Sequence, residues 1–407
     1  MHHYSLQAAG TQRSTAPLRV IVGGFLGLLP AGGITWDYLQ YPLGFASLGH
    51  DVFYVEDTRL WPVYQDSSGD FSCASNVDHL ARVMQAFALA DRWAYRDEVS
   101  GKCFGMSASR VAEVCQSADV FVNISCSTYL RDEYRRIPVR VLIDTDPMFT
   151  QIQYATQSGF TAGETGMRGL VAGHTHHFTF GESVGAPDCR IPETEVRWRA
   201  TRQPICLDQW PHLPGHSPEL PFTTVMNWTA GRPLAYGGET WGQKDVEFMR
   251  IMDLPRHTSA GLAAAVGQTT GEPFPFDAAT YAGWQILDPA ASAGDWEDYR
   301  QFIQRSLGEF SVAKETYVKG RTGWFSCRSA CYLASARPVV TQDTGWTRHI
   351  PSGSGLIGFT TMDEAAAGLD LILSDPVRHG ESARGIAEEF FDAQKVLAKM
   401  LDQVTSQ

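Results

Sequence analysis

Several kinds of sequence signal are missing from this 407-residue chain, and each absence narrows its function. The eight cysteines are scattered without a Cys-x-x-Cys pair, which favours reduced thiols over a disulfide framework. No apolar run approaches the roughly 20 residues that a membrane helix needs, and the N-terminus lacks the pattern of a signal peptide. A net charge of −12 without a polybasic block argues against nucleic acids and anionic membranes as partners. We therefore expect a cytoplasmic protein with no integral membrane segment.

The chain instead shows a regular alternation of short apolar runs and segments with helical periodicity. Arg19–Val22 is a predicted strand, followed by a Gly/Pro-rich loop and a helix whose expected cap is Thr35 or Asp37. Asp51–Glu56 is the next predicted strand, which completes a strand–helix–strand unit. Similar units recur to Asp144 and, in a second run, from residue 221 onward. The alternation predicts an α/β protein with mostly parallel sheets.

Proline density marks the predicted boundary between the two runs. Five prolines fall between residues 204 and 221, a composition typical of linkers. The polar first 17 residues predict a disordered tail, and helical periodicity is almost continuous from 375 to 403. The predicted organisation is a tail at 1–17, an N-terminal domain at 18–215, a C-terminal domain at 216–385 and a terminal helix at 386–407.

The strongest functional pattern lies between residues 322 and 345. A Gly-Trp-Phe-Ser turn at 323–326 leads into a helix of small residues, then a strand at 339–341 and a polar loop at 342–345. Free N–H groups and the helix dipole favour a diphosphate at such a helix N-terminus, and α/β sheets bind ligands in the loops that follow their strands. A diphosphate beside hydroxyl-binding side chains indicates a nucleotide-sugar.

This segment resembles the donor-binding part of glycosyltransferases with the GT-B architecture, and of family 1 in particular. The 323–326 turn is similar to the Gly-Trp-Asn-Ser turn of inverting members, and Ala-Ser-Ala-Arg-Pro-Val-Val at 334–340 to a shared Ala-x-Gly-x-Pro-Val run. Thr322 replaces the histidine of the inverting members, whereas Gly323 and Cys331 stand where retaining members carry two glutamates. The resemblance implies two facing Rossmann-like domains, with a C-terminal helix that crosses back to the N-terminal domain.

The resemblance also implies the donor site. Ser326, Arg328 and Lys244 would hold the diphosphate, and Asp343 would accept from sugar hydroxyls. The alternative for Arg328 and Lys244 is that both side chains simply face solvent. Gly283–Leu287 is the expected place for contacts with the nucleotide base. The complete set of candidate donor residues is Lys244, Gly323, Trp324, Ser326, Arg328, Ser329, Asp343 and Thr344.

Asp37, Asp146 and His174 are the candidate catalytic residues. Asp37 follows the first loop, where Gly32-Gly33 would let an acceptor approach, and is either the general base or a helix cap. Asp146 belongs to an Asp-x-Asp sequence, which either binds Mn²⁺ through hard oxygen ligands or has a strand-end role; we expect no metal. His174 is either an acid/base or a packing residue.

The function predicted from the sequence is metal-independent transfer of a sugar from a UDP- or dTDP-linked donor to a small-molecule acceptor. Inversion at the sugar carbon is favoured, no further cofactor is expected, and a homodimer is one option for the assembly. Two alternatives stay open: a sugar-nucleotide epimerase on the same scaffold and a non-catalytic nucleotide-sugar binding protein. A dehydrogenase is disfavoured because the glycines at 23–27 depart from Gly-x-Gly-x-x-Gly, although Glu56 ends the second strand.

Overall fold

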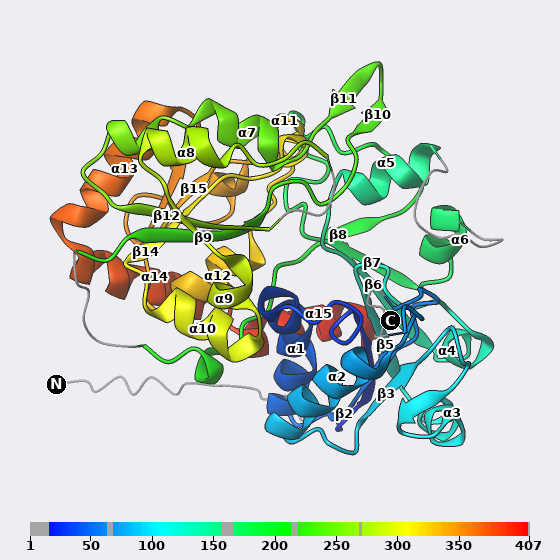
Figure 1. Cartoon of the computed structure of the whole chain (residues 1–407). Coiled ribbons are helices and arrows are strands. Elements are labelled where there is room, and N and C mark those ends of the chain that lie inside the picture. Colours follow the sequence, from blue (N-terminus) through cyan, green and yellow to red (C-terminus); the bar gives the residue numbers. More distant parts are fainter. Residues whose placement is uncertain (1–15, 63–67, 157–165, 213–218, 268–270, 406–407) are drawn as a thin grey trace, which may run out of the picture.

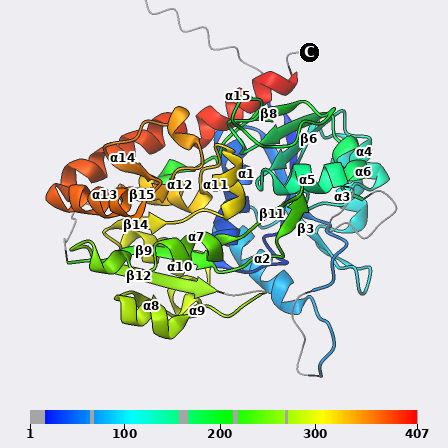
Figure 2. The same cartoon turned by 90° about the horizontal axis from the view of Figure 1, so that it is seen from above.

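The computed structural model describes residues 16–62, 68–156, 166–212, 219–267 and 271–405. Two sheets lie side by side, one built from the first half of the chain and one from the second (Figures 1 and 2). Most of the predicted tail and the centre of the proline-rich stretch, residues 213–218, lie outside the described residues.

The first sheet has eight strands in the order β4-β3-β2-β1-β5-β6-β7-β8. All neighbours are parallel except β3 and β4. The strands are β1 Arg19–Gly23, β2 Asp51–Glu56, β3 Trp93–Arg96, β4 Cys103–Gly105, β5 Val120–Ile124, β6 Val139–Asp144, β7 His176–Thr179 and β8 Trp198–Ala200. The helices between them are α1 Gly32–Ser47, α2 Ala74–Ala86, α3 Ala108–Gln116, α4 Asp132–Arg135, α5 Phe149–Thr156 and α6 Gly166–Ala172.

The start of α1 differs from the sequence prediction. The helix begins at Gly32 with Ala31 as its N-cap, and no side chain caps it. Thr35 and Asp37 therefore lie inside the helix, and the predicted capping role of Asp37 is wrong. Thr35 instead hydrogen-bonds His79 of α2 at 2.9 Å, which helps to fix α1 against α2.

The second sheet has six parallel strands in the order β13-β12-β9-β14-β15-β16. These are β9 Phe222–Asn227, β12 Leu262–Gly267, β13 Gln285–Leu287, β14 Gly308–Ser311, β15 Val339–Gln342 and β16 Leu356–Phe359, and β10 Leu234–Tyr236 pairs separately with β11 Glu239–Trp241. The α-helices of this half are α7 Lys244–Arg250, α8 Phe276–Ala282, α9 Pro289–Ala293, α10 Trp296–Gln304, α11 Glu315–Gly320, α12 Cys327–Ala334, α13 Met362–Ser374, α14 Pro376–Phe390 and α15 Ala393–Thr405. Short 3₁₀ helices are η1 Leu207–Gln209, η2 Leu254–Arg256 and η3 Trp346–Arg348.

The sequence analysis missed three strands of this sheet, β12, β14 and β16. The apolar part of β12 is mostly alanine, and β14 contains the polar residues Glu309 and Ser311, so neither has the branched apolar run that marks a buried strand. The strand that precedes the 322–345 segment is therefore β14. The expected contact of Gly283–Leu287 with the nucleotide base requires that this strand, β13, directly precede the 322–345 segment. In the structure, β13 is the edge strand on the far side of the sheet.

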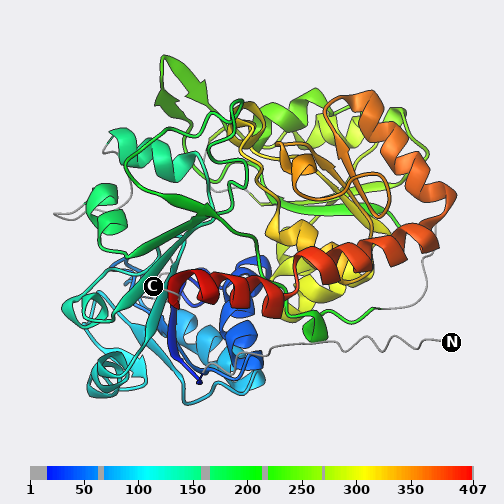
Figure 3. The same cartoon turned by 180° about the vertical axis from the view of Figure 1, so that it is seen from behind.

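The C-terminal helices connect the two halves. The predicted continuous helix breaks at Phe391 and Asp392, where Asp392 forms a bridge with Ile205. After the break, α15 lies on α1 of the first half (Figure 3). Leu397 of α15 packs over Gly44 of α1. One hydrophobic cluster includes buried side chains from both halves, so the contact between the halves is a true core.

Leu397→Ala is expected to lower the free energy of unfolding by about 2–5 kcal/mol, because Leu397 is fully buried and its loss leaves a cavity between α15 and α1. Urea denaturation followed by tryptophan fluorescence measures the change. The matched control is Leu371→Ala on α13, where the side chain is 49% exposed and the change should be small. Equal effects of the two substitutions would contradict the packing role of α15.

Among the helices in the described ranges, none combines the length and the apolar composition required to cross a bilayer.

Candidate active site between the two sheets

Both sheets reverse their strand order at one point, and these two points bound the candidate site. The reversal lies between β1 and β5 in the first sheet and between β9 and β14 in the second. Open parallel sheets bind ligands beyond the carboxyl ends of the strands at such a point. In the first sheet, Phe25 follows β1, Ser125 follows β5, and Thr145 and Asp146 follow β6, and all four line one cavity.

This cavity has a volume of about 280 Å³. The first half of the chain provides almost all of its walls, and Cys327, the first residue of α12, closes it from the second half. The lining residues are Phe25, Leu29, Ile34, Asp37, Tyr38, Ile124, Ser125, Thr145, Asp146, Gln203 and Cys327. The cavity therefore lies where the two halves meet.

Asp37 is the carboxylate of α1 that lines this cavity. Burial raises its pKa to about 7, although Arg328 and a hydrogen bond with Cys327 lower it. A carboxylate with a pKa near 7 is a stronger base than an ordinary aspartate and is still about half ionised at neutral pH. The structure thus brings the predicted base into the cavity with a pKa suited to that role.

The loop that forms one wall of the cavity is held by a buried carboxylate that the sequence analysis did not connect with it. Glu56 at the end of β2 accepts from the main-chain N–H of Gly27 at 2.7 Å and of Leu28, and Tyr54 donates to it at 3.0 Å. Asn76 of α2 donates to the carbonyl of Gly27 at 2.8 Å. These contacts fix the loop between β1 and α1, which carries the cavity residues Phe25 and Leu29.

Glu56→Gln is expected to loosen this loop and raise the KM for a substrate that binds in the cavity, because an amide cannot accept both N–H bonds as a carboxylate does. Burial raises the pKa of Glu56 to about 7, against the lowering effect of the Gly27 and Leu28 N–H groups, so an uncharged side chain should not destabilise the fold strongly. Hydrogen exchange of the Gly27 and Leu28 amides measures the loosening directly. Unchanged exchange and unchanged KM would contradict it.

Asp146 reaches across the boundary between the halves. Its carboxylate accepts from Lys314, which follows β14, at 2.5 Å, and from Tyr317 of α11. Burial alone would raise the pKa of Asp146, but Lys314 and Tyr317 lower it below its usual value. Asp144, the other carboxylate of the Asp-x-Asp sequence, is buried and accepts hydrogen bonds from three side chains, those of Thr150, Gln151 and Thr179.

Three cationic side chains of the second half gather beside Asp146. Burial, followed by repulsion from Arg328 and Lys314, lowers the pKa of Lys244 well below its usual value. Arg328 keeps only 11% of its side chain exposed, donates to Glu309 at 2.5 Å and to the carbonyl of Val225 at 2.7 Å, and so does not extend into solvent. Lys244 is the first residue of α7 and is partly buried. Lys314, which the sequence analysis missed, is the third member.

The N-terminus of α12 lies next to these cations. Ser326 is its N-cap, but the Ser326 side chain makes no capping hydrogen bond. Ser329, in the first turn, has a buried hydroxyl without a partner among the described residues. The first N–H groups of a helix are unpaired within the helix and favour an anion. The predicted phosphate-binding turn is thus next to Arg328, with hydroxyls that other groups have not taken up.

Gly323 and Trp324 shape the turn before α12. Gly323 has φ of +75°, and a Cβ there would lie 2.6 Å from the Ser183 hydroxyl of the first half, so this position requires glycine. Its N–H donates to the carbonyl of Thr344 at 2.9 Å, and the Thr344 hydroxyl donates to the Trp324 carbonyl at 2.6 Å. Trp324 stacks on Tyr317 with ring centroids 4.4 Å apart.

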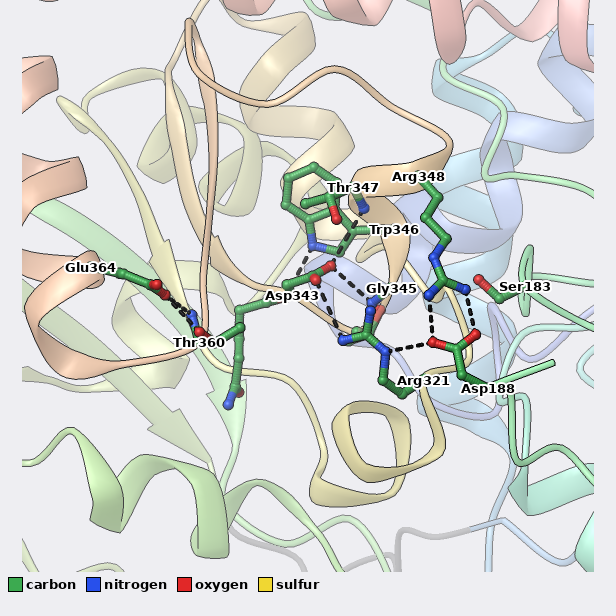
Figure 4. Close-up of polar contacts among 12 residues, drawn as sticks. Ser183, Asp188, Arg321, Asp343, Gly345, Trp346, Thr347, Arg348, Thr360 and Glu364 are labelled. Atoms are coloured by element: carbon green, nitrogen blue, oxygen red, sulfur yellow. Dashed lines mark hydrogen bonds and ion pairs between the residues drawn. The ribbon is translucent and has the colours of Figure 1, made fainter. Parts of the chain in front are cut away.

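Asp343 lies in an ion network that links the two halves (Figure 4). Its carboxylate accepts from the Gly345 N–H at 2.8 Å and is 3.6 Å from Arg321. Arg321 and Arg348 both pair with Asp188, which belongs to the segment after β7. Asp343 and Thr344 are thus already engaged with protein groups, and their predicted contact with sugar hydroxyls stays a prediction.

The structure does not place His174 or Gly32 where the sequence analysis expected them to act. His174 is buried inside the first half, where its ring nitrogens contact the Leu170 carbonyl at 2.9 Å and Asn123 at 3.2 Å, and it does not line the cavity. Burial lowers the pKa of His174 to about 3, as expected for a neutral packing residue. Gly32 does not receive an acceptor, because a Cβ there would lie 2.1 Å from the carbonyl oxygen of Asp295. It allows close contact between α1 and α10.

No protein-family model matches the chain, and no curated protein sequence does. Among solved structures it is similar to an alpha-glucosyltransferase in complex with UDP and a 13-mer DNA, with a TM-score of 0.58, 14% identity and coverage of 96% of this chain and 100% of that one. It is also similar to AviGT4, a glycosyltransferase involved in avilamycin A biosynthesis, with a TM-score of 0.53, 12% identity and coverage of 96% of this chain and 97% of that one. A glycosyltransferase from Rickettsia africae has a TM-score of 0.51, 10% identity and coverage of 96% of this chain and 99% of that one. The fold is that of the GT-B glycosyltransferases.

The GT-B assignment confirms the predicted α/β architecture of two facing Rossmann-like domains and the C-terminal helix that crosses back. Within this fold, the sequence analysis missed Lys314 and Tyr317 because β14 itself was not recognised. It noted Glu56 only as the end of a strand. In the GT-B structure described here, the candidate base Asp37 and the cations of the second half approach the same boundary between the two sheets.

Proposed function

We propose that this protein transfers a sugar from a UDP- or dTDP-linked donor to a small-molecule acceptor. The observation that carries the proposal is the meeting of two complementary groups at one boundary. Asp37, with its pKa near 7, lines the cavity of the first half. Lys244, Lys314 and Arg328 gather on the second half beside the N-terminus of α12. A base opposite an anion-binding group suits transfer to a hydroxyl with a diphosphate leaving group.

The proposed reaction is a single displacement. Asp37 takes the proton of the acceptor hydroxyl while the acceptor oxygen bonds to C1 of the sugar and the bond from C1 to the diphosphate breaks. The electron pair of that bond remains on the diphosphate, where the cations and the first N–H groups of α12 stabilise it. Attack from the side opposite the leaving group inverts C1. The cations provide the charge stabilisation, so we propose that transfer needs no metal ion.

A small acceptor is supported by the confined cavity and the net charge of −12. Among the structural relatives, the alpha-glucosyltransferase was solved with DNA. An acidic protein repels the phosphate backbone, on which DNA affinity largely depends. We therefore propose that this chain differs from that relative in its acceptor.

The test is thermal stabilisation by UDP, dTDP, GDP, ADP and their sugars, with and without Mn²⁺. One nucleotide and its sugar are expected to raise Tm without the metal, and the active donor should release its nucleoside diphosphate when an acceptor is present. No shift with any nucleotide would overturn the proposal, and a shift that requires Mn²⁺ would overturn its metal independence. Isomerisation of the sugar without an acceptor would support an epimerase instead.

A further inference from the structure

Most polar side chains of the 280 Å³ cavity already have a hydrogen-bond partner within the protein. The Ser125 and Thr145 hydroxyls hydrogen-bond each other at 2.6 Å. The Gln203 amide donates to the main-chain oxygen of Asp37 at 3.1 Å, and the Asp146 carboxylate is held by Lys314. A polyol would need several free partners when it loses its water shell, because unpaired polar groups are costly to bury.

Asp37 is the exception among these polar residues. The partner identified for its carboxylate is the thiol of Cys327, which is a weak hydrogen-bond donor. A ligand hydroxyl is a stronger donor and would replace that contact. The cavity thus provides one acceptor whose present partner is weak, which suits a ligand with one hydroxyl directed at Asp37.

The remaining walls are mostly apolar and partly aromatic, and the Tyr38 hydroxyl among them hydrogen-bonds with Ser125. Leu29, Ile34 and Ile124 contribute aliphatic surface. The rings of Phe25 and Tyr38 meet edge to face, with centroids 5.9 Å apart. Aromatic walls favour flat apolar ligands, and the volume is near the lower end of the roughly 300–1,000 Å³ range of ligand pockets. A molecule of one or two rings fits this space, and a polymer does not.

Charge further restricts the ligand. Of the described residues that line the cavity, none is Lys, Arg or His, whereas two are aspartates. An acceptor with a phosphate or carboxylate would therefore face Asp37 and Asp146, and the nearby Lys314 is already paired with Asp146. An uncharged ligand avoids this repulsion.

We propose that the acceptor is an uncharged, largely apolar molecule of one or two rings that presents a hydroxyl to Asp37. This inference rests on the proposed function, since it assigns the cavity to the acceptor. It adds the chemical class of that acceptor, which neither the fold nor the donor site determines. The carboxylate receives the hydroxyl proton, and the ring system displaces water from the apolar walls.

The first experiment measures binding without any donor. The probes are 4-methylumbelliferone and 2-naphthol, with glucose and a DNA oligonucleotide carrying a hydroxymethylated base as the polar comparisons. Ile34→Trp and, separately, Leu29→Phe reduce the space on two sides of the cavity. Each is expected to weaken binding of the two arenes by about 10–200-fold, the range for a misfitted group in an apolar pocket. Val377→Trp, at a residue of α14 that is 55% exposed, is the matched control.

The second experiment measures turnover of the same four compounds with the donor identified by thermal stabilisation. Transfer to the arenes, with little or none to glucose or DNA, supports the inference. Donor binding with transfer only to glucose or DNA would overturn the acceptor class and leave the glycosyltransferase proposal standing. Arene binding without a response to any nucleotide would overturn the proposed function and the acceptor role together. Retained arene binding in both cavity variants, if they are folded by circular dichroism, would place the ligand elsewhere and overturn the inference.

Discussion

Replacing Asp37 with Asn should reduce kcat by about 10²–10⁴-fold, the range for loss of a positioned general base. Burial raises the pKa of Asp37 to about 7, so about half of the native carboxylates are ionised at neutral pH, and the ionised form is more basic than an ordinary aspartate. An amide has the same shape and cannot take the proton. The rate of nucleoside diphosphate release at saturating donor and acceptor measures the effect, and donor binding should be unchanged.

The pH dependence of Asp37 has opposite signs for rate and stability. Because the base works when deprotonated, the wild-type rate should rise through pH 7 and then level off, and Asp37→Asn should lose this rise. The folded protein keeps a proton on Asp37 between the ordinary pKa of 3.8 and about 7, whereas the unfolded chain has lost it. The contribution of this group to the free energy of unfolding therefore falls as the pH rises across that interval. At pH 8, the Asn variant should be more stable than the wild type.

The matched control for Asp37→Asn is Asp402→Asn, at an exposed residue of α15. This control should leave the rate, the pH profile and the stability unchanged. An Asp37→Asn variant with near-normal kcat would show that the base lies elsewhere. A variant that loses donor binding as well would indicate that Asp37 supports the fold of the site and not proton transfer alone.

Replacing Lys244 with Met should weaken donor binding by about 10- to 100-fold, since a charged hydrogen-bond partner contributes about 1.5–3 kcal/mol. The same change should stabilise the protein when no donor is bound. Burial and repulsion from Arg328 and Lys314 lower the pKa of Lys244 well below its usual value, so the site without its anion disfavours this charge. Calorimetric titration with the nucleoside diphosphate and the Tm of the free protein measure the two effects.

A second consequence concerns protons. A diphosphate next to Lys244 favours its charged form, so donor binding by the wild type should take up protons in the pH range where Lys244 of the free site has lost its proton, and Lys244→Met should reduce this uptake. Titrations in buffers with different ionisation enthalpies measure the number of protons. Lys399→Met, at an exposed residue of α15, is the control and should change neither affinity nor uptake. Lower Tm together with normal donor affinity in Lys244→Met would contradict the anion-binding role.

The site was predictable from the sequence where one short segment carries the information. The turn at 323–326, the small-residue helix and the strand after it are contiguous, so their order was enough to place Ser326 and Arg328 at a helix N-terminus. Lys314 and Tyr317 could not be found in this way, because they follow β14 and its buried Glu309 hides the strand pattern. The partner of Glu309 is Arg328, which is 19 residues away in the chain.

The sequence by itself determined the α/β class, the two runs of strands and helices and the donor-like segment, since each follows from local periodicity and turn chemistry. Only the tertiary structure decided what the individual side chains do. From the sequence, Asp37 was better suited to capping a helix or packing than to acting as a base, and its burial in a cavity closed by α12 is what raises its pKa. His174 looked suited to catalysis, and its packing inside the first half removes it from the cavity. The burial of a side chain and the charges near it depend on residues that are far apart in the chain. Both can therefore be determined only when the two halves are placed together.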